Sequence, residues 1–487
     1  MNRIINTSIF KLPFVVGILL SICMVCIGCN NNGDNHTDPN QSTQVKNEVD
    51  MWLTSSDQKS LLTKQNTVIA FTEKPNNYPS IVIDTSIEFQ SIDGFGYTLT
   101  GGSAKLMQQM SSFNRDQLLQ EIFGCSGDQS CISYLRISIG ASDLDEKVFS
   151  YNDLHQDSTD YTLKKFSLGY DTLYLLPLLK SILKIKPDIK LMATPWSPPI
   201  WMKTNKNSIG GSLKPECYGV YADYFVKYIQ YMANMGVNID AVTIQNEPQH
   251  GGNNPSLVMS STEQANFIKD HLGPKFEAAG LKTKIIIWDH NCDQPTFPIS
   301  ILNVPSAKKY IDGSAFHLYN GDISALSQVH AIHPEKNLYF TEQWTGANGT
   351  FGEDLIWHIK NVIIGSTRNW SKVALEWNLA NDPAYKPHTP GGCTQCKGAY
   401  TIDKNISVKN VSYYIIAHAS RFVSAIAKRV KSTDIDKIHH VVFLEKDGKK
   451  AMIAANETEN NEIFNIELNG KKAIMSLPAK SVATFVW

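Results

Sequence analysis

Short runs of apolar residues alternate with longer segments of helical periodicity over most of the chain. Between about Ser91 and Leu379, eight runs have the length and composition of buried strands: IDGFGYTL, YLRISIG, KLMATPWS, AVTIQNEP, KIIIWDHN, GSAFHLY, NLYFTEQW and KVALEWNL. Amphipathic segments lie between them, such as YGVYADYFVKYIQYMANMG, which ends at Gly236, and STEQANFIKDHLGPKFEAAG, which ends at Gly280. Repeated alternation of strand and helix predicts parallel strands, and eight such units over about 290 residues predict an α/β fold of the (β/α)8 barrel type.

Most of these predicted strands begin with apolar residues and end with polar or aromatic ones. The residues at these ends are Arg136 and Ser138, Trp196 and Ser197, Asn246 and Glu247, Asp289 and His290, His317 and Tyr319, Glu342, and Glu376 and Asn378. In a parallel barrel these ends face one way, so we expect them to form one site. A doubly wound sheet is the alternative fold, but GFGYTLTGG lacks the spacing of dinucleotide-binding glycines.

The pattern changes after Leu379. The segment NDPAYKPHTPGGCTQCKG is typical of a long loop, and SVKNVSYYIIAHASRFV predicts the last helix around the barrel. From Ala427 the chain has short alternating strands with turn signals such as KDGK and LNGK. We therefore predict a barrel over residues 91–426 and a small β-sandwich over residues 427–487, which strands within residues 63–90 join.

The first residues have the pattern of an export signal. Basic residues precede the apolar run LPFVVGILLSICMVCIGC, which predicts a signal peptide over residues 1–28. CIGC resembles a bacterial lipobox that places a lipid on Cys29, although Cys26 stands where leucine is usual. A plain signal peptide or an N-terminal anchor helix is the alternative. Residues 29–62 begin with a polar stretch without aromatics, which predicts a flexible tether. We expect a lipid-anchored protein of a Gram-negative cell envelope, at the outer membrane or cell surface or facing the periplasm.

The composition excludes some classes of partner. Of the 487 residues 42% are hydrophobic, 10% are aromatic and 19% are charged, and the formal net charge is −1. A chain of this length favours one large domain with a smaller one. Because the net charge creates no overall field, nucleic acid and anionic membrane surfaces are poor partners. We expect a monomer.

The cysteines agree with an oxidising compartment. Cys125 and Cys131 flank the short polar loop CSGDQSC and could close it. CTQC lies in a loop rich in glycine and proline and contains Cys393 and Cys396. A CxxC motif can indicate a zinc or redox site, but no second CxxC and no pair of histidines at zinc-ligand spacing accompanies it in the sequence, so a local disulfide is favoured. The remaining pair of cysteines, Cys217 and Cys292, has no assignment.

Two glutamates stand at the ends of predicted strands. Glu247 lies in QNEP and Glu342 in YFTEQW, and both strands would open onto the same mouth of the barrel. Two facing carboxyl groups can break a glycosidic bond when one is protonated and the other is ionised. A salt-bridged rim residue is the alternative for either glutamate alone. Their neighbours are Asn, Gln and Trp rather than Lys, which favours a catalytic pair.

The ordered set of motifs resembles glycoside hydrolase family 30, the family of lysosomal glucosylceramidase and microbial β-1,6-glucanases. The motifs that carry the resemblance are QSIDGFGYTLT, YLRISIGASDLD, MATPWSPPIWMKTN, TIQNEPQ, IIIWDHN, FHLY, YFTEQW, LEWNLANDP and SYYIIAHASRFV. They fall in the family's order over residues 90–430, and the flanking β-domain is also typical of the family. A single motif such as NEP is weak, but the ordered set is specific.

The resemblance implies roles for individual residues. It makes Glu247 the acid/base and Glu342 the nucleophile, while Asn246 would bind the 2-hydroxyl of the sugar beside the cleaved bond. The other residues implied for the substrate site are Arg136 and Tyr319 beside the nucleophile, Asp143 for a distal hydroxyl, Trp196 and Trp377 as aromatic walls, Trp344 on the leaving-group side, and His317 as a supporting or subsite residue. The large Trp344 departs from the small residues that lysosomal glucosylceramidase has at this position.

Structural roles remain open for several of these residues. Arg136 could form a rim ion pair, and Asp143 could be a turn or helix cap. Trp196 and Trp377 could be simple packing residues, and His317 could be a core histidine. Asp289 and His290 are polar enough for the site, and they equally suit a structural role.

The resemblance implies double displacement with retention of configuration. It requires no metal and no cofactor, and His250, His290 and His317 lack the spacing of metal ligands. The motifs TPWSPPIWMKTN and WNLANDP favour the glucoside branch over the xylanases. We expect a β-1,6-glucanase, with glucosylceramidase-like or β-glucosidase activity on glycoconjugates as the alternative. A non-catalytic carbohydrate-binding lipoprotein or a structural envelope protein is the alternative from another class.

Overall fold

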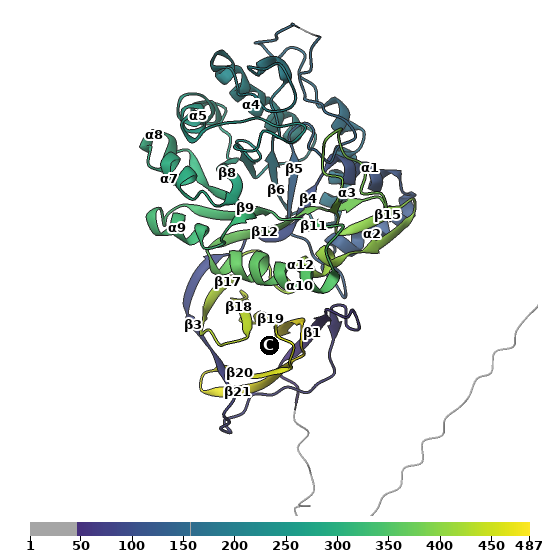
Figure 1. Ribbon diagram of the computed structural model, residues 1–487, viewed down its shortest axis with the longest axis vertical. Helices are drawn as coiled ribbons and strands as arrows, with labels where there is room; N and C mark the ends of the chain where they lie inside the picture. The colour runs from purple at the N-terminus through teal and green to yellow at the C-terminus, as the bar shows by residue number, and fades with distance from the viewer. Residues whose placement is uncertain (1–45, 156) are drawn as a thin grey trace, which may run out of the picture. The chain divides into compact units, whose positions relative to one another are not determined.

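The structure of the protein is a computed structural model that describes residues 46–155 and 157–487 (Figure 1). The predicted signal peptide, Cys29 and the tether up to residue 45 lie outside the described residues. Within the described part of the chain, no helix is both long enough and apolar enough to span a bilayer.

Eight parallel strands close into a barrel, as the alternation of strand and helix predicts. In chain order they are β4 (Gly94–Leu99), β5 (Tyr134–Ser138), β6 (Lys190–Thr194), β7 (Ala241–Thr243), β8 (Lys284–Cys292), β9 (Ile311–Gly321), β10 (Asn337–Glu342) and β12 (Ser371–Asn378). Each coincides with one of the eight apolar runs, and β12 pairs with β4 to complete the closure. The doubly wound alternative is therefore wrong.

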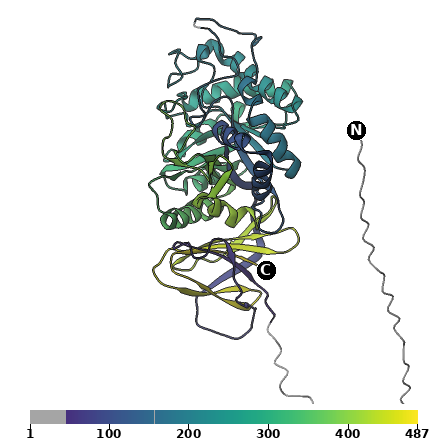
Figure 2. The ribbon, with the colours of Figure 1, turned by 90° about the vertical axis from the view of Figure 1, so that its right-hand side faces the viewer.

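Helices connect the strands and surround the barrel (Figure 2). They are α1 (Gly101–Gln109), α2 (Ser112–Phe123), α3 (Leu175–Ile185), α4 (Tyr218–Asn234), α5 (Ser261–Phe267), α6 (Gly273–Ala278), α7 (Thr296–Leu302), α8 (Pro305–Lys308), α9 (Ala325–Ile332), α10 (Phe351–His358), α11 (Ser366–Arg368) and α12 (Val411–Ser420). Wider turns η4 (Ile268–Leu272) and η5 (Ile359–Gly365) extend α5 and α10, and short turns η1 (Gly169–Thr172), η2 (Ile200–Met202) and η3 (Pro215–Cys217) lie in the loops.

Local chemistry explains where two of the predicted helices begin and end. A capping box opens α5, because Ser260 accepts from the backbone of Glu263 and the Glu263 carboxylate accepts from the backbone of Ser260. Gly236 and Gly280, which follow α4 and α6, have left-handed φ values of 84° and 65° that favour glycine.

The interior of the barrel is filled by side chains rather than open. One buried cluster combines large and small residues from the strands: Tyr134, Met192, Ala241, Ile286, Ala315, Tyr339, Val373 and Leu375. This packing leaves the ends of the strands as the places where polar side chains can gather.

A nine-stranded sheet forms the second core. Its order is β2-β1-β22-β19-β18-β17-β3-β20-β21, with β1 (Asp50–Ser55), β2 (Thr63–Lys64), β3 (Ser80–Ser91), β17 (Lys428–Ser432), β18 (Ile438–Leu444), β19 (Lys450–Asn456), β20 (Glu462–Leu468), β21 (Lys471–Leu477) and β22 (Ser481–Val486). The residues on its buried face include Ile81, Met452, Phe464 and Phe485. The turn between β20 and β21 is the predicted LNGK turn, with left-handed Asn469 and Gly470.

The tether predicted over residues 29–62 extends too far. Strand β1 pairs with β22 along its whole length and buries Met51 and Leu53 in the sheet. This strand also connects the two cores, because His418 of α12 is hydrogen-bonded to Thr54 of β1 at 2.8 Å and to Thr484 of β22 at 2.9 Å. The tether prediction is therefore wrong from residue 50 onwards.

Two small sheets accompany the loops after β10 and β12. Strand β11 (Thr345–Gly346) pairs with β14 (Cys396–Lys397), and β13 (Ala380–Asn381) pairs with β15 (Tyr400–Asp403), which pairs with β16 (Ile406–Lys409). Both local disulfides suggested by the cysteine spacing are present, Cys125–Cys131 and Cys393–Cys396. Cys217 and Cys292 are buried free thiols.

Candidate active site

Glu247 lies on a sharply turned segment beyond the end of β7. Its φ is 47°, a left-handed value that is uncommon for a residue other than glycine. Backbone contacts to the two neighbouring strands hold this turn: the Asn246 N–H donates to the carbonyl of Pro195 at 2.9 Å, and the Glu247 N–H donates to the carbonyl of Asp289 at 3.0 Å. The surrounding structure therefore imposes a backbone conformation that places a carboxyl group at the mouth of the barrel.

Glu342 ends β10, and two donors hold it directly. Arg136 of β5 donates from Nη1 to Glu342 Oε2 at 2.5 Å, and Tyr319 of β9 donates from its hydroxyl to Oε1 at 3.0 Å. Each carboxylate oxygen thus accepts a hydrogen bond, which favours the ionised form of Glu342.

The two glutamates face one another at short range. A carboxylate oxygen of Glu247 and one of Glu342 lie within 4.8 Å of each other, and both lie within the same distance of His317 Nδ1. Retaining glycosidases place their two carboxyl groups about 5–5.5 Å apart, whereas inverting enzymes leave roughly 6.5–9.5 Å for a water molecule. The observed spacing suits direct attack by one of the carboxylates.

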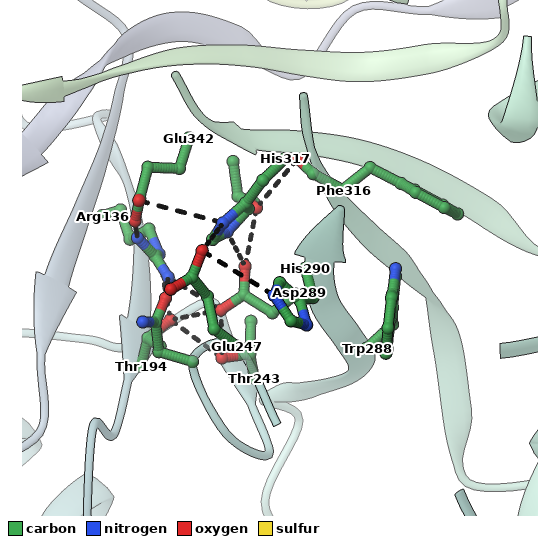
Figure 3. Close-up of polar contacts among 12 residues, drawn as sticks. Arg136, Thr194, Thr243, Glu247, Trp288, Asp289, His290, Phe316, His317 and Glu342 are labelled. Atoms are coloured by element: carbon green, nitrogen blue, oxygen red, sulfur yellow. Dashed lines mark hydrogen bonds and ion pairs between the residues drawn. The ribbon is translucent and has the colours of Figure 1, made fainter. Parts of the chain in front are cut away.

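Asp289 lies at the centre of the polar network that includes the two glutamates (Figure 3). It accepts hydrogen bonds from Arg136 Nη2 at 2.8 Å and from His317 Nε2 at 3.1 Å. Three threonine hydroxyls from neighbouring strands also donate to it, those of Thr341 at 2.6 Å, Thr243 at 2.8 Å and Thr194 at 3.4 Å. Asp289 is completely buried, so this network neutralises and satisfies a charge that water does not reach.

The charges of the buried cluster can be counted. Burial alone would lower the pKa of His317, but Glu342, Asp289 and Glu247 raise it to about 9, so the imidazole is cationic at neutral pH. Burial opposes ionisation of Asp289 as well, but Arg136 and His317 hold its pKa far below the usual range. With Arg136 also cationic, the cluster is neutral when the two glutamates together carry one negative charge. One shared proton is therefore the favoured state of the pair.

The environment acts differently on the two glutamates. Burial raises the pKa of Glu342, although His317 and Arg136 oppose that rise. Burial also opposes ionisation of Glu247, but the hydrogen bond to His317 and the charge of His317, with smaller contributions from nearby histidines, together lower its pKa. Direct contacts point the other way, because a proton on Glu342 would compete with the Arg136 or Tyr319 donor. Glu247 Oε2 receives only a longer contact from Asn253 at 3.3 Å, which leaves room for a proton. These contacts favour the ionised form of Glu342 and the protonated form of Glu247.

A cavity of about 320 Å³ opens above this pair. Eight of the residues predicted for the site line it: Asp143, Trp196, Asn246, Glu247, Tyr319, Glu342, Trp344 and Trp377. The rings of Trp196 and Trp377 lie 5.5 Å apart, and the Arg136 guanidinium lies 4.8 Å from the Trp196 ring. Asn246 Oδ1 accepts from Arg136 Nη2 at 2.7 Å, which orients its amide Nδ2 as a free donor among the described residues.

Arg136 and His317 were predicted among the substrate-site residues, Arg136 beside the nucleophile and His317 as a supporting or subsite residue. Arg136 does contact Glu342, and His317 contacts Glu247 and Asp289, but neither side chain lines the cavity. Both side chains are completely buried and contact the carboxyl groups rather than the cavity. Their effect on a ligand would pass through the glutamates that they hold. His290 lines the cavity, and burial lowers its pKa to about 4, so it is neutral there.

Several cavity residues were not among those predicted for the site. They are His250, Asn253, Asn291, Cys393 and Cys396. Thr194, Thr243 and Thr341 were missed as well, although a threonine at the end of an otherwise apolar strand is a signal that the sequence carries. The cavity cysteines lie in a loop without periodicity, which gave no such signal.

A metal ion does not suit this donor set. Glu247, His317 and Glu342 have the spacing of a metal site. However, both ring nitrogens of His317 face carboxylates, and its pKa of about 9 keeps both protonated at neutral pH. Without a free imidazole lone pair, the cluster offers only the two glutamates as ligands.

Comparison with known proteins identifies relatives over nearly the whole described chain. A model of the glycosyl hydrolase family 30 TIM-barrel domain matches residues 92–423, and a model of the family 30 beta sandwich domain matches residues 427–485. The endo-1,6-beta-D-glucanase neg1 of Aspergillus fumigatus is 31% identical over 425 residues, 82% of this chain and 85% of that protein. The lysosomal acid glucosylceramidase of Mus musculus is 27% identical over 438 residues, 82% of each chain. The solved structure of the endo-beta1,6-glucanase BT3312 superposes with a TM-score of 0.84 at 34% identity, covering 90% of this chain and 99% of that one.

Proposed function

This chain belongs to glycosyl hydrolase family 30, and from that membership and the cavity geometry we propose that it is a retaining β-1,6-glucanase. The observation that carries the chemistry is the facing pair of carboxyl groups, whose oxygens lie within 4.8 Å in a cavity walled by tryptophans.

Glu342 is the proposed nucleophile. Its carboxylate attacks the anomeric carbon, and the bond from that carbon to the leaving oxygen breaks to give a covalent glycosyl ester. Arg136 and Tyr319 each donate to one carboxylate oxygen, which orients the group and stabilises its charge before the attack. His317 contributes a second positive charge, at 3.8 Å from Glu342 Oε1.

Glu247 is the proposed acid and base. The protonated His317 donates from Nδ1 to Glu247 Oε1 at 3.3 Å, so the catalytic proton would reside on Oε2. Glu247 gives this proton to the leaving oxygen and later accepts one from the water that hydrolyses the ester. Two inversions at the same carbon restore the β configuration.

The cavity residues are suited to a sugar. Trp196 and Trp377 offer aromatic surface, and the free Nδ2 of Asn246 is a donor for the hydroxyl next to the reacting carbon. We assign Asp143 to a distal hydroxyl and Trp344 to the leaving-group side of the cavity, because both line it. No step requires a metal or an organic cofactor.

The relatives support β-1,6-glucan as the substrate. The endo-1,6-glucanases are 31% and 34% identical to this chain, and the mouse glucosylceramidase is 27% identical. Glucosylceramidase-like or β-glucosidase action on glycoconjugates is the second candidate, because similarity to that enzyme also extends over both domains.

Sugar release tests the proposal. Purified protein is incubated separately with β-1,6-glucan, β-1,3-glucan, xylan and glucosylceramide, and the products are separated by chromatography. We expect release from β-1,6-glucan above all others, and its absence would overturn the first assignment. NMR of the first products should show the β anomer, whereas initial formation of the α anomer would contradict retention.

For the location of the enzyme, we infer a lipid anchor at Cys29 in the cell envelope, with residues 1–28 removed as a signal peptide. The lipobox-like CIGC supports this, and two disulfides suit an oxidising compartment. In cells, Cys29→Ser should move the protein from the membrane fraction to the soluble fraction. An unchanged membrane fraction would contradict lipidation at this residue.

A further inference from the structure

The Cys393–Cys396 disulfide lies in the wall of the sugar cavity. Both cysteines line the cavity beside the two glutamates, and they pack in one apolar cluster with Trp196, Trp377 and Trp344. The other disulfide, Cys125–Cys131, closes a largely exposed loop after α2 and does not line the cavity. The two bridges therefore have the same chemistry in very different places.

The loop that carries this disulfide contacts the segments that follow three barrel strands. After β5, Asp143 accepts from the Thr389 N–H at its carbonyl, at 2.9 Å, and from the Cys393 N–H at its carboxylate, at 3.3 Å. After β7, Asn254 donates from its side chain to the carbonyl of Pro390 at 2.8 Å. After β10, the Ala347 N–H donates to the carbonyl of Gln395 at 2.8 Å.

The loop approaches Asp143 as closely as a backbone can. A Cβ atom on Gly392 would lie 2.3 Å from the carbonyl oxygen of Asp143, so only glycine permits this contact. Immediately after Gly392, the disulfide closes a ring that includes Cys393 and Cys396. The close backbone approach and the covalent closure therefore act on the same few residues.

We propose that the Cys393–Cys396 disulfide determines sugar binding, because it fixes the loop wall of the cavity and holds the Cys393 N–H on the Asp143 carboxylate. This inference rests on the proposed glycosidase function and adds a binding element to it. The disulfide would contact the sugar directly as wall surface, and it would position Asp143 through the backbone donor.

The effect should appear in KM rather than in kcat. Glu247 and Glu342 are held by Arg136, His317 and Tyr319, and none of these depends on the loop. Without the bridge, each bound sugar must order the loop, which weakens binding while the chemistry of the bound complex is retained. We expect KM to rise roughly tenfold and kcat to change less than about threefold.

Asp143 provides a second signature. Burial raises its pKa to about 7, with a further contribution from Glu342, and the Cys393 N–H opposes this rise. Loss of that donor would raise the pKa of Asp143 further, which lowers the ionised fraction of its carboxyl group by a larger factor at pH 6 than at pH 8. If the ionised carboxylate accepts the sugar hydroxyl, KM of the variant should exceed that of the wild type by a larger factor at pH 6. Mere loosening of a loop would not produce this dependence on pH.

The test compares two double variants, C393S/C396S and C125S/C131S, in the full chain. Kinetics on β-1,6-glucan and on an aryl β-glucoside at pH 6 and pH 8 should show the increase in KM for the first variant only. Equal KM values for C393S/C396S and the wild type would overturn the proposal. An equal rise in both variants would overturn it as well, because the effect would then not belong to the cavity wall.

Reversible reduction covers the case in which C393S/C396S does not fold. In the C125S/C131S background, Cys393–Cys396 is the remaining disulfide of the described chain. Dithiothreitol reduces it to two thiols and becomes a cyclic disulfide itself. KM should rise on reduction and return after reoxidation, with the circular dichroism spectrum unchanged. A KM that does not respond to complete reduction, verified by mass, would overturn the proposal.

Sugar binding separates this inference from the proposed function. Tryptophan fluorescence can follow binding of gentiobiose, a β-1,6-linked diglucose, because Trp196, Trp344 and Trp377 line the cavity. A wild type without activity on any β-glycoside would refute the proposed function. In that case, weaker gentiobiose binding in C393S/C396S, with unchanged binding in C125S/C131S, would still support the disulfide as a binding element. Unchanged binding in C393S/C396S, or no binding to the wild type, would overturn the role of the disulfide.

Discussion

The two ends of the barrel each carry a charged cluster, but in opposite environments. At the carboxyl ends, Arg136 and Asp289 have completely buried side chains, and Glu342 is only 8% exposed. At the amino ends, Lys284 is 39% exposed and lies 3.8 Å from Asp93 and 3.7 Å from Asp312. The amino-end cluster is therefore partly exposed to water, whereas the carboxyl-end cluster is shielded from it.

This difference separates charges that stabilise a fold from charges that perform chemistry. Exposed ion pairs contribute about 0–1 kcal/mol each, so the amino-end cluster can be altered at little cost in stability. A buried cluster has no comparable advantage over apolar packing, since desolvation offsets much of the attraction between its charges. Its presence at the carboxyl ends is explained by the reaction that it supports. The comparison predicts large effects at one end and small effects at the other.

The largest effect is expected for Glu342→Gln. The amide cannot attack the anomeric carbon, so kcat on β-1,6-glucan should fall by about 10⁴-fold or more. Circular dichroism and thermal unfolding check that the fold is retained. Turnover within tenfold of the wild type, in a folded variant, would remove Glu342 from the role of nucleophile.

Glu247→Gln should have a somewhat smaller effect that depends on the leaving group. Loss of the acid should lower turnover of the glucan by about 10²–10⁴-fold. An aryl β-glucoside whose phenolate leaves without a proton should still form the covalent intermediate, and added azide should release it as a glycosyl azide. The same large loss with every leaving group would argue that Glu247 is not the acid.

Stability should also distinguish the two ends. Arg136→Met leaves the buried carboxylates of Asp289 and Glu342 without their shared cation, so the free energy of unfolding should fall by about 3–5 kcal/mol. Urea unfolding at neutral pH measures this change. A loss below about 1 kcal/mol would show that water reaches the cluster and that the comparison is wrong.

His317 gives the carboxyl end a pH dependence. Its pKa is raised from 6.5 to about 9, so its contribution to stability is fully present below 6.5 and is lost as the pH rises through 9. The free energy of unfolding should fall by about 3 kcal/mol in total over this range. His317→Gln should remove this part of the slope, and an identical slope in the variant would assign it to other groups.

Much of the fold could be predicted because the barrel repeats one simple pattern. Each of the eight apolar runs became a strand of the barrel, and many of the polar residues that end them met at one mouth. Glu376 is an exception, because it is buried and hydrogen-bonded to His358 of α10 instead of lining the cavity. Strand β1 was missed because a strand of six residues next to a polar segment carries little periodicity. Its alternation of buried Met51 and Leu53 with half-buried Asp50 and Trp52 has meaning only once β22 is beside it.

The site was predictable where function and strand position coincide. Glu247 and Glu342 fall at strand ends, so their residue types and positions indicated chemistry. Asp289 has the same kind of position, but only the structure shows that it joins Arg136 and His317. The disulfide wall could not be placed, because contacts between the loop and Asp143 arise from tertiary packing of segments about 250 residues apart in the chain.

The smallest effect is expected for Lys284→Met, at the amino end. Lys284 is 39% exposed, and its contacts to Asp93 and Asp312 are longer than 3.5 Å, so removing its charge should change the free energy of unfolding by less than about 1 kcal/mol. Even this difference should shrink in high salt, because ions screen exposed pairs. Since no contact joins Lys284 to the glutamates, kcat and KM should stay within twofold of the wild type.

Urea unfolding at low and high salt, measured for Lys284→Met and Arg136→Met in parallel, allows the free energies of unfolding at the two ends to be compared directly. A loss of 3 kcal/mol that salt leaves unchanged would mean that the amino-end charges are as interdependent as the catalytic ones, and exposure alone would then not distinguish a stabilising cluster from a working one.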